Sequence, residues 1–251
     1  MSRLIRLLKS ARNSIYENVY PSRININNRN TIFSFSFDDV PISAMRVGAR
    51  ILESHSAPGT FYVAMGMSDV ETNSCQREYL NDEDLILLQN KGHDVQCHTY
   101  NHLSAKRNSP KVLLEDCEKN FTRLRKVLKG KRMDHFAFPF GEVSLRAKKV
   151  LNKRYKTMRS VEHGINVGIT DASHLRGVSL CNIDFDRARI NKAIQAALDK
   201  NAWVIFFTHE VCDSPSDWGT NTNDFKWVVE QCAMSHGVIL SVSAAYNEII
   251  K

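Results

Sequence analysis

The sequence lacks several features that would fix its class at once. Its 251 residues include no run of about 18 apolar residues, so no segment is expected to span a membrane. The six Cys are scattered without a C-x-x-C pair, which argues against a disulfide framework and against a thiolate zinc site. Eleven Gly and six Pro are too few for a fibrous or low-complexity protein. No Walker loop is present, and no G-x-G-x-x-G follows the first expected strand, so a nucleotide cofactor is not expected.

Positive charge is concentrated in two parts of the chain. The formal net charge is +7, but residues 106–159 contain seventeen Lys or Arg against five Asp or Glu, and residues 1–30 contain six against one. No nucleic-acid-binding motif accompanies this charge, so nucleic acid is not the expected partner. Lys119, Arg123 and Lys126 have the spacing of one helix face. They serve either docking to an anionic surface or solubility alone.

The first thirty residues form a basic arm before the globular domain. Basic residues interrupt the apolar ones, so no signal-peptide core exists and a cytoplasmic protein is expected. The apolar residues between Leu4 and Ile15 fall on one helical face. Such a helix either lies on an anionic membrane as a peripheral contact or packs against the main body. A polar linker at 25–30 follows, so we divide the chain into the arm, residues 1–30, and a catalytic domain, residues 31–251.

From residue 31 onward, β-rich runs alternate with helical patterns. The patterns predict strands at 31–37, 60–65, 93–97, 135–138, 155–161, 178–181, 203–208 and 237–242. They predict helices at 42–54, 82–91, 110–129, 143–152, 186–200 and 223–236. This alternation implies parallel strands joined by right-handed crossovers. Seven or eight such units fit one α/β barrel or a barrel-like sheet better than two domains.

Candidate functional residues follow the carboxyl ends of the predicted strands, where parallel α/β folds place their working groups. Two carboxylates, three imidazoles and a Gly-containing turn occupy these positions, namely Asp38, Asp39, His98, His102, His209 and the turn 139–141. Together they predict an active site at one rim of the barrel.

The spacing of these residues suggests their roles. His98 and His102 are four residues apart, so on one helical turn both rings would face the same way and share an ion. One carboxylate from Asp38 or Asp39 then completes a His₂Asp site with a position left for water, which is typical of catalysis. The other carboxylate can accept a proton from that water, and His209 could protonate a leaving group. Cys97 is expected to lie in the core.

Four segments carry a resemblance to a known family. SFDDV, HTYNH, FAFPFG and FFTHE occur in this order and resemble the ordered motifs of the polysaccharide deacetylases, carbohydrate esterase family 4. The resemblance extends from residue 31 to about residue 245. It implies a distorted (β/α) barrel of about seven parallel strands. It also implies a hydrolase that removes N- or O-acyl groups from sugars with one divalent metal ion, commonly zinc.

The resemblance also implies a role for each matching residue. Asp38 matches the catalytic base and His209 the general acid. The positions that match the metal ligands are Asp39, His98 and His102. Phe140 matches the residue whose backbone N–H binds the oxyanion, and Gly141 completes that turn.

The sequence departs from the family pattern at two places. Ala137 stands where the family often has an Arg that pairs with the catalytic Asp, and Arg176 is the candidate for supplying that charge from elsewhere. The family's Asp that orients the acid histidine is not evident, which leaves three candidates: Asp171, Asp184 and Asp213. Trp218, shortly after His209, is a candidate platform for stacking a sugar.

Three functions are compatible with these residues. The favoured one is a metal-dependent deacetylase that acts on an oligosaccharide or a lipid-linked glycan precursor, with Zn²⁺ as the expected ion. The alternatives are a metal hydrolase acting on a non-sugar amide and a catalytically inactive glycan-binding module. Both Asp38 and His209 are present, which argues against the inactive module because binding alone needs no base opposite an acid.

Overall fold

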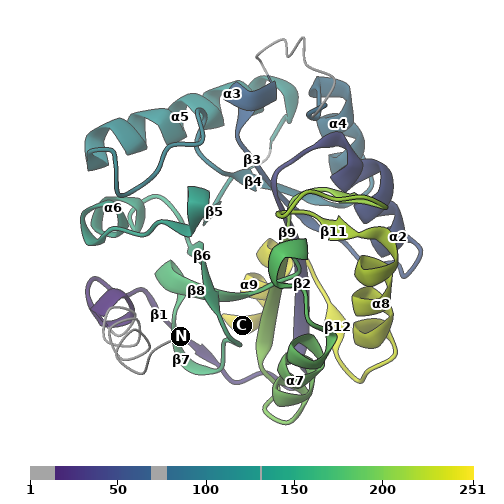
Figure 1. The fold of residues 1–251 in the computed structure, drawn as a ribbon. Helices are drawn as coiled ribbons and strands as arrows, with labels where there is room; N and C mark the ends of the chain where they lie inside the picture. Colours follow the sequence, from purple (N-terminus) through teal and green to yellow (C-terminus); the bar gives the residue numbers. More distant parts are fainter. Residues whose placement is uncertain (1–14, 69–77, 131) are drawn as a thin grey trace.

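A closed barrel of seven parallel strands forms the centre of the protein (Figure 1). The structure is a computed structural model that describes residues 15–68, 78–130 and 132–251. The barrel strands are β2 (Ile32–Asp39), β3 (Thr60–Val63), β4 (Asp94–Cys97), β5 (His135–Ala137), β6 (Thr157–His163), β8 (Leu175–Ser179) and β9 (Trp203–Thr208). The barrel closes because β2 pairs with both β3 and β9. The predicted barrel of about seven parallel strands is therefore confirmed.

Helices lie around the outside of the barrel (Figure 1). They are η1 (Ala44–Ala49), α2 (Arg50–Glu53), α3 (Met65–Ser68), α4 (Asp82–Asn90), α5 (Pro110–Val127), α6 (Leu145–Leu151), α7 (Arg187–Leu198) and α8 (Thr222–Ala233). Local signals fix several starts: Asn81 forms a capping box at α4, and Ser109 caps α5 ahead of Pro110. The helix predicted at 42–54 is not α-helical over Ala44–Ala49, because these residues form the π-helix η1.

Alternation along β2 decides which side chains enter the barrel. Phe35 and Phe37 pack with other aromatic rings in the main hydrophobic core, and the Phe35 ring lies 5.7 Å from that of Phe225 in α8. Ser34 and Ser36 alternate with these rings and form hydrogen bonds with the neighbouring strand β9. The Trp203 indole N–H donates to the Ser34 hydroxyl, and the Ser36 hydroxyl donates to the backbone carbonyl of Phe206. Asp38 continues the serine side of the strand. The period of two therefore brings this carboxylate into the barrel interior, at the carboxyl end of β2.

The amino-terminal end of the barrel is covered by elements that the sequence patterns missed. The strand predicted at 237–242 is shorter than expected. It is present only as β12 (Val238–Ile239), because α9 (Val242–Ile249) begins soon after it. The backbone N–H of Val242 donates to Thr60 at the start of β3, at 2.8 Å. Beside α9, β1 (Arg23–Ile26) pairs antiparallel with β7 (Gly168–Asp171). After β9 in the chain, β10 (Val211–Cys212) and β11 (Thr220–Asn221) pair with each other in a separate two-stranded parallel sheet.

The described part of the amino-terminal arm packs against the main body. The buried ammonium of Lys148 in α6 binds the backbone carbonyls of Tyr16 and Val19 and the carboxylate of Asp171. Residues 23–26, placed partly in the predicted linker, form a strand instead. Residues 1–14, which hold most of the predicted amphipathic helix, lie outside the described residues. Within the described ranges, no helix has the length and apolar character needed for a membrane span.

Candidate active site

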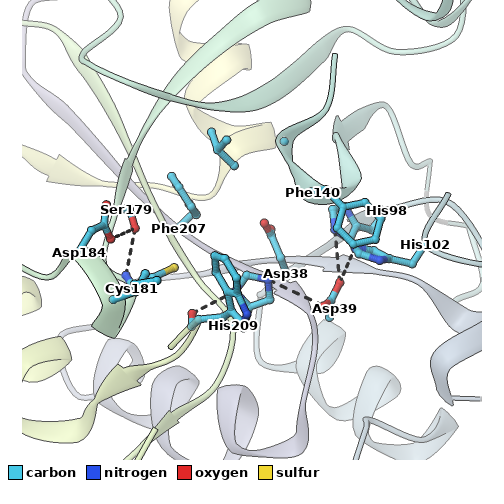
Figure 2. A pocket seen from close by; sticks show the side chains of 14 residues that line it. Asp38, Asp39, His98, His102, Phe140, Ser179, Cys181, Asp184, Phe207 and His209 are labelled. Atoms are coloured by element: carbon cyan, nitrogen blue, oxygen red, sulfur yellow. Dashed lines mark hydrogen bonds and ion pairs between the residues drawn. The ribbon is translucent and has the colours of Figure 1, made fainter. Parts of the chain in front are cut away.

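A cavity of about 550 Å³ opens at the carboxyl ends of the barrel strands (Figure 2). Eight of the nine site residues predicted from the sequence line it: Asp38, Asp39, His98, His102, Phe140, Gly141, His209 and Trp218. Arg176, the ninth, does not. The remaining walls come from Asp184, which the sequence offered only as a candidate partner of His209, and from five residues that it did not single out: Val161, Ser179, Cys181, Ile183 and Phe207.

Asp39, His98 and His102 converge on one point. The Asp39 Oδ1 atom lies 3.4 Å from His98 Nε2 and 3.1 Å from His102 Nε2. One donor atom from each residue lies within 4.8 Å of the others, which is the spacing of a metal site. His98 Nδ1 donates to the backbone carbonyl of Ala137 at 2.8 Å, which leaves Nε2 free to act as a ligand. Two imidazole nitrogens and one carboxylate oxygen suit a divalent ion such as zinc.

The turns that carry this set hold an unusual backbone conformation. Of the eight non-glycine residues with positive φ in the described ranges, five belong to the site motifs: Asp39, Val40, Thr99, His102 and Phe140. Such conformations cost about 1–3 kcal/mol each and cluster at functional sites. The prediction that the two histidines share a helical turn is wrong. Thr99 and His102 instead adopt left-handed conformations in an irregular turn, which brings the two rings to 5.0 Å.

Helix α5 holds the histidine turn in place through buried polar side chains. The carboxylate of Asp116 accepts the backbone N–H of Tyr100 at 2.8 Å and that of Asn101 at 2.9 Å. The Asn120 amide accepts from Met65 N–H and donates to a β3 carbonyl, so it joins α5 to the neighbouring strand end. These contacts fix the backbone of the turn from outside the cavity. Cys97, as predicted, is buried in the core.

Asp38 is paired with Arg159, a residue that the sequence analysis missed. Arg159 Nη2 lies 2.5 Å from both carboxylate oxygens of Asp38, and its side chain is 1% exposed. Arg159 in β6 is the register partner of Ala137 in β5. The guanidinium therefore reaches Asp38 from the strand next to the family position. The predicted strand at 155–161 holds two cations, Lys156 and Arg159, so the sequence pattern alone does not single out Arg159.

The electrostatics of the two carboxylates follow from these contacts. Burial alone would raise the pKa of Asp38, but the Arg159 guanidinium, with His98 and His209, lowers it below its usual range. Burial would also raise the pKa of Asp39, but hydrogen bonds from His102 and His98 hold it far below its usual range. Both carboxylates are therefore anionic at neutral pH, as a base and a metal ligand must be.

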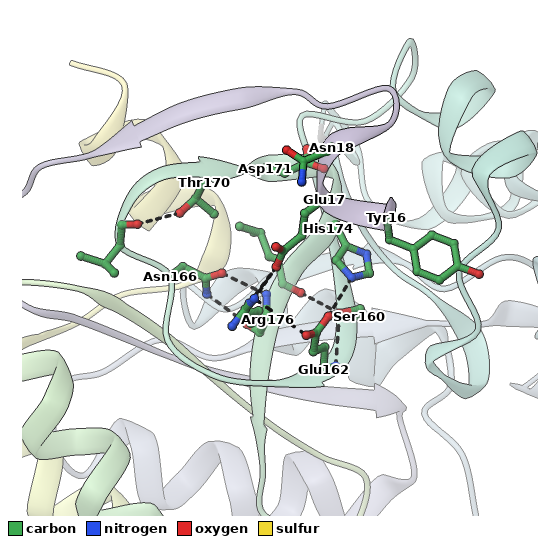
Figure 3. A network of polar contacts seen from close by, with 12 residues as sticks. Tyr16, Glu17, Asn18, Ser160, Glu162, Asn166, Thr170, Asp171, His174 and Arg176 are labelled. Atoms are coloured by element: carbon green, nitrogen blue, oxygen red, sulfur yellow. Dashed lines mark hydrogen bonds and ion pairs between the residues drawn. The ribbon is translucent and has the colours of Figure 1, made fainter. Parts of the chain in front are cut away.

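Arg176 serves a different part of the molecule, so the prediction that it supplies the missing charge is wrong (Figure 3). Its Nε and Nη2 atoms donate to the Glu17 carboxylate at 2.9 and 2.5 Å. Glu162 lies next to it, 3.8 Å away, and also contacts His174 at 3.1 Å. This network joins the amino-terminal segment to β6 and β8 and is separate from the cavity.

His209 is oriented by a backbone group. Its Nδ1 atom donates to the backbone carbonyl of Trp218 at 3.1 Å, so Nε2 faces Asp39, whose Oδ2 lies 3.8 Å away. Two of the three aspartates considered for this task use their carboxylates elsewhere: Asp171 binds Lys148, and Asp184 accepts from Ser179 at 2.7 Å. For Asp213, the hydrogen bond seen is one that its backbone carbonyl accepts from Asn221.

The turn after β5 completes the rim beside the metal-site residues. Phe140 has φ of 58°, and its ring lies 4.3 Å from the His102 ring. Gly141 has φ of 62°, and a Cβ there would lie 2.1 Å from the Val161 side chain. Only glycine fits this position without moving β6. The glutamate after this turn, Glu142, accepts a hydrogen bond from Ser104 and so joins it to the histidine turn.

Comparison with known families agrees with the geometry. A family model described as polysaccharide deacetylase matches residues 26–158, which is more than half of the chain. The protein belongs to the polysaccharide deacetylase family, whose members are hydrolases that deacetylate sugars. The match includes Asp38, Asp39, His98 and His102 and ends before Arg159 and His209. No curated protein matches the chain.

Solved structures share the same fold at low sequence identity. Bacillus subtilis PdaA, a family 4 carbohydrate esterase, has a TM-score of 0.61 and 14% identity over 95% of this chain and 89% of its own. A family 4 acetyl xylan esterase from Clostridium thermocellum, in complex with a cobalt ion, has a TM-score of 0.60 and 13% identity over 86% and 91%. The peptidoglycan deacetylase PdaC from Bacillus subtilis has a TM-score of 0.56 and 15% identity over 88% and 92%. These likenesses establish the barrel fold.

Proposed function

We propose that the protein is a metal-dependent hydrolase that removes an N-acyl, or by the same chemistry an O-acyl, group from a sugar. The sugar belongs to an oligosaccharide or a lipid-linked glycan precursor. One observation carries the proposal: a single cavity holds a buried Asp–His–His set, an Arg-paired carboxylate beside it, and a third histidine facing both. A binding module would not need this separation of base and acid.

The metal would be held by Asp39, His98 and His102, with Zn²⁺ as the expected ion. When bound, a divalent ion supplies a Lewis acid that polarises the acyl carbonyl and lowers the pKa of water to about 7. The acetyl xylan esterase with cobalt supports this proposal because it shares the fold. So does the hydrogen bond from His98 to the Ala137 carbonyl, which presets the ligand tautomer.

The chain's own residues then perform the proton transfers. Asp38 accepts a proton from the attacking water, whose oxygen bonds to the acyl carbon. The backbone N–H of Phe140 donates to the carbonyl oxygen as negative charge builds on it. His209 Nε2 donates a proton to the sugar nitrogen as the C–N bond breaks. The products are a carboxylate and a sugar with a free amine.

The sugar would lie beside His209, because its nitrogen must receive the proton from that residue. Trp218 is the nearby aromatic ring, 53% exposed, with its centroid 6.5 Å from the His209 ring. An exposed indole at this place can stack on the apolar face of a pyranose. Trp218 therefore contributes twice, through its backbone to His209 and through its ring to the sugar.

Acetate release from N-acetylglucosamine oligomers tests the proposal. The full chain, loaded with Zn²⁺, is expected to release acetate and free amine in equal amounts. A chelator should abolish the release and added metal should restore it. Hydrolysis of simple amides without any sugar activity would favour the non-sugar hydrolase. Oligosaccharide binding without hydrolysis by the loaded protein would favour the inactive glycan-binding module.

A further inference from the structure

The cavity is divided into two chemically different halves (Figure 2). His98, His102 and Asp39 lie on one side of Asp38. Phe207 and Cys181 lie on the other side. Ile183, two residues after Cys181 in the chain, and Val161, which lies against Gly141, also line the cavity. The polar residues of this second half, Ser179 and Asp184, hydrogen-bond to each other at 2.7 Å. Away from the metal-site residues, the wall therefore combines the apolar side chains of Phe207 and Cys181 with the hydrogen-bonded pair Ser179 and Asp184.

Large apolar side chains also surround the opening. Phe140 is 58% exposed, Ile183 59%, Trp218 53% and Val161 44%, and all four line this one cavity. Single exposed apolar residues are ordinary on a protein surface, but several around one opening mark a binding surface. Trp218 can stack on a sugar, but an acetylated sugar has no apolar group larger than the acetyl methyl to place against Val161 and Ile183.

The chemistry of the site places the parts of a bound amide. The carbonyl oxygen must face the metal-site residues and Phe140, and the nitrogen with its sugar must face His209 and Trp218. The remaining substituent of the acyl carbon then points to the unused side of the cavity, toward Phe207 and Cys181. The cavity volume of about 550 Å³ is within the range of sites that bind drug-sized ligands.

We infer that the acyl group of the natural substrate is an aliphatic chain longer than acetyl, held by Phe207, Cys181, Val161 and Ile183. This inference rests on the proposed function and names the class of acyl group removed. The reaction is the same hydrolysis: water adds to the acyl carbon, the C–N bond breaks, and the nitrogen takes a proton. The products are a fatty carboxylate and an amino sugar.

The test is a chain-length series on the metal-loaded full chain. The substrates are glucosamines carrying N-acetyl, N-butanoyl, N-hexanoyl and N-octanoyl groups, and the measured quantity is kcat/KM from amine release. Each buried methylene is worth about fourfold, so kcat/KM is expected to rise by about that factor per methylene until the chain fills the cavity. A flat or falling profile overturns the inference while leaving deacetylation intact. Failure to hydrolyse any member overturns both.

A second series of substrates shows whether an increase in kcat/KM comes from the acyl chain or from another apolar group of the substrate. Alkyl glycosides of N-acetylglucosamine with methyl, butyl, hexyl and octyl aglycones place the same chains on the sugar instead of the acyl carbon. The inference predicts little change in kcat/KM along this series. A gain with the aglycone series alone would show that the apolar wall binds a group beyond the sugar, and would overturn the assignment to the acyl chain.

Two variants test whether the apolar residues of the cavity cause the dependence of kcat/KM on acyl length. Val161→Thr replaces a methyl with a hydroxyl at the same size, and Ile183→Thr also shortens the side chain by one carbon. Both are expected to lower the dependence of kcat/KM on acyl length. The matched control is Ile169→Thr, since Ile169 in β7 is 75% exposed and lies outside this cavity. That variant should keep the full chain-length dependence. Equal dependence in all three variants would contradict the inference.

Discussion

Arg159 in β6 forms a buried ion pair with Asp38 in β2, with Nη2 at 2.5 Å from both carboxylate oxygens. The two side chains meet inside the barrel, where little water remains to screen their charges. Arg159 thus compensates the negative charge of Asp38, which the proposed mechanism uses as a base. It stands in for the Arg that the family often has at the position of Ala137, one strand away.

Arg159→Met is expected to reduce both stability and turnover. Breaking a buried pair by removing one partner costs about 3–5 kcal/mol, because the other charge remains buried and unpaired. Thermal unfolding and kcat on an N-acylated sugar measure the two effects. The control, Arg46→Met, removes the exposed pair with Glu78 and should change stability by less than about 1 kcal/mol.

Moving the cation back to the family position should restore part of the loss. Because Ala137 and Arg159 are register partners, the double variant Ala137→Arg/Arg159→Ala can present a guanidinium to Asp38 from the neighbouring strand. We expect it to recover part of the turnover that Arg159→Met loses. If Arg159→Met turns over at the wild-type rate, the ion pair is only structural.

Asp38→Asn should separate catalysis from metal binding. The amide keeps the size of the side chain and a hydrogen bond to Arg159, but it cannot accept a proton from water. Loss of a general base typically costs about 10²–10⁴-fold in rate. We therefore expect full metal content by elemental analysis and a fall in kcat of this size. A metal-free Asp38→Asn protein would reverse the assignment of Asp38 and Asp39.

The active-site rim was largely predictable because its residues follow strands with strong local signals. The period of two in TIFSFSF and the apolar run WVIFFT locate their strand ends, and hence Asp38 and His209, without knowledge of pairing. The partner of Asp38 was not predictable in this way. Arg159 depends on the register between β5 and β6, which no local pattern encodes.

The amino-terminal end of the barrel was missed for a related reason. RINI at 23–26 is too short to mark a strand alone, and its pairing with β7 joins segments far apart in the sequence. Helix α9 was obscured because Val242, its first residue, follows the apolar run 238–240 so closely that it reads as part of the same strand. The backbone carbonyl of Trp218 that orients His209 carries no side-chain signal at all.

Stability should fall in mild acid because of a buried histidine. Burial lowers the pKa of His135 to about 4, whereas an unfolded histidine has a pKa of about 6.5. Between these values the unfolded chain binds the extra proton, so the free energy of unfolding falls as pH falls from about 6.5 to 4. At 1.36 kcal/mol per pKa unit, His135 contributes about 3 kcal/mol to this loss.

Urea unfolding at several pH values measures this contribution. His135→Asn cannot titrate and should flatten the dependence of unfolding free energy on pH between 4 and 6.5. His55→Asn, at an exposed histidine, should leave the dependence as it is in the wild type. An unchanged slope in His135→Asn would mean that other groups produce the acid sensitivity.

The dependence of acyl release on metal content tests the central claim most directly. Metal-free protein is titrated with Zn²⁺ while bound metal and amine release from an N-acylated glucosamine are measured on the same samples. We predict activity that rises in proportion to bound metal and ends at one ion per chain. His98→Ala should neither retain the ion nor gain activity, whereas His55→Ala should behave as wild type. Full activity in the metal-free protein, or one tightly bound ion in His98→Ala, would contradict the proposed site.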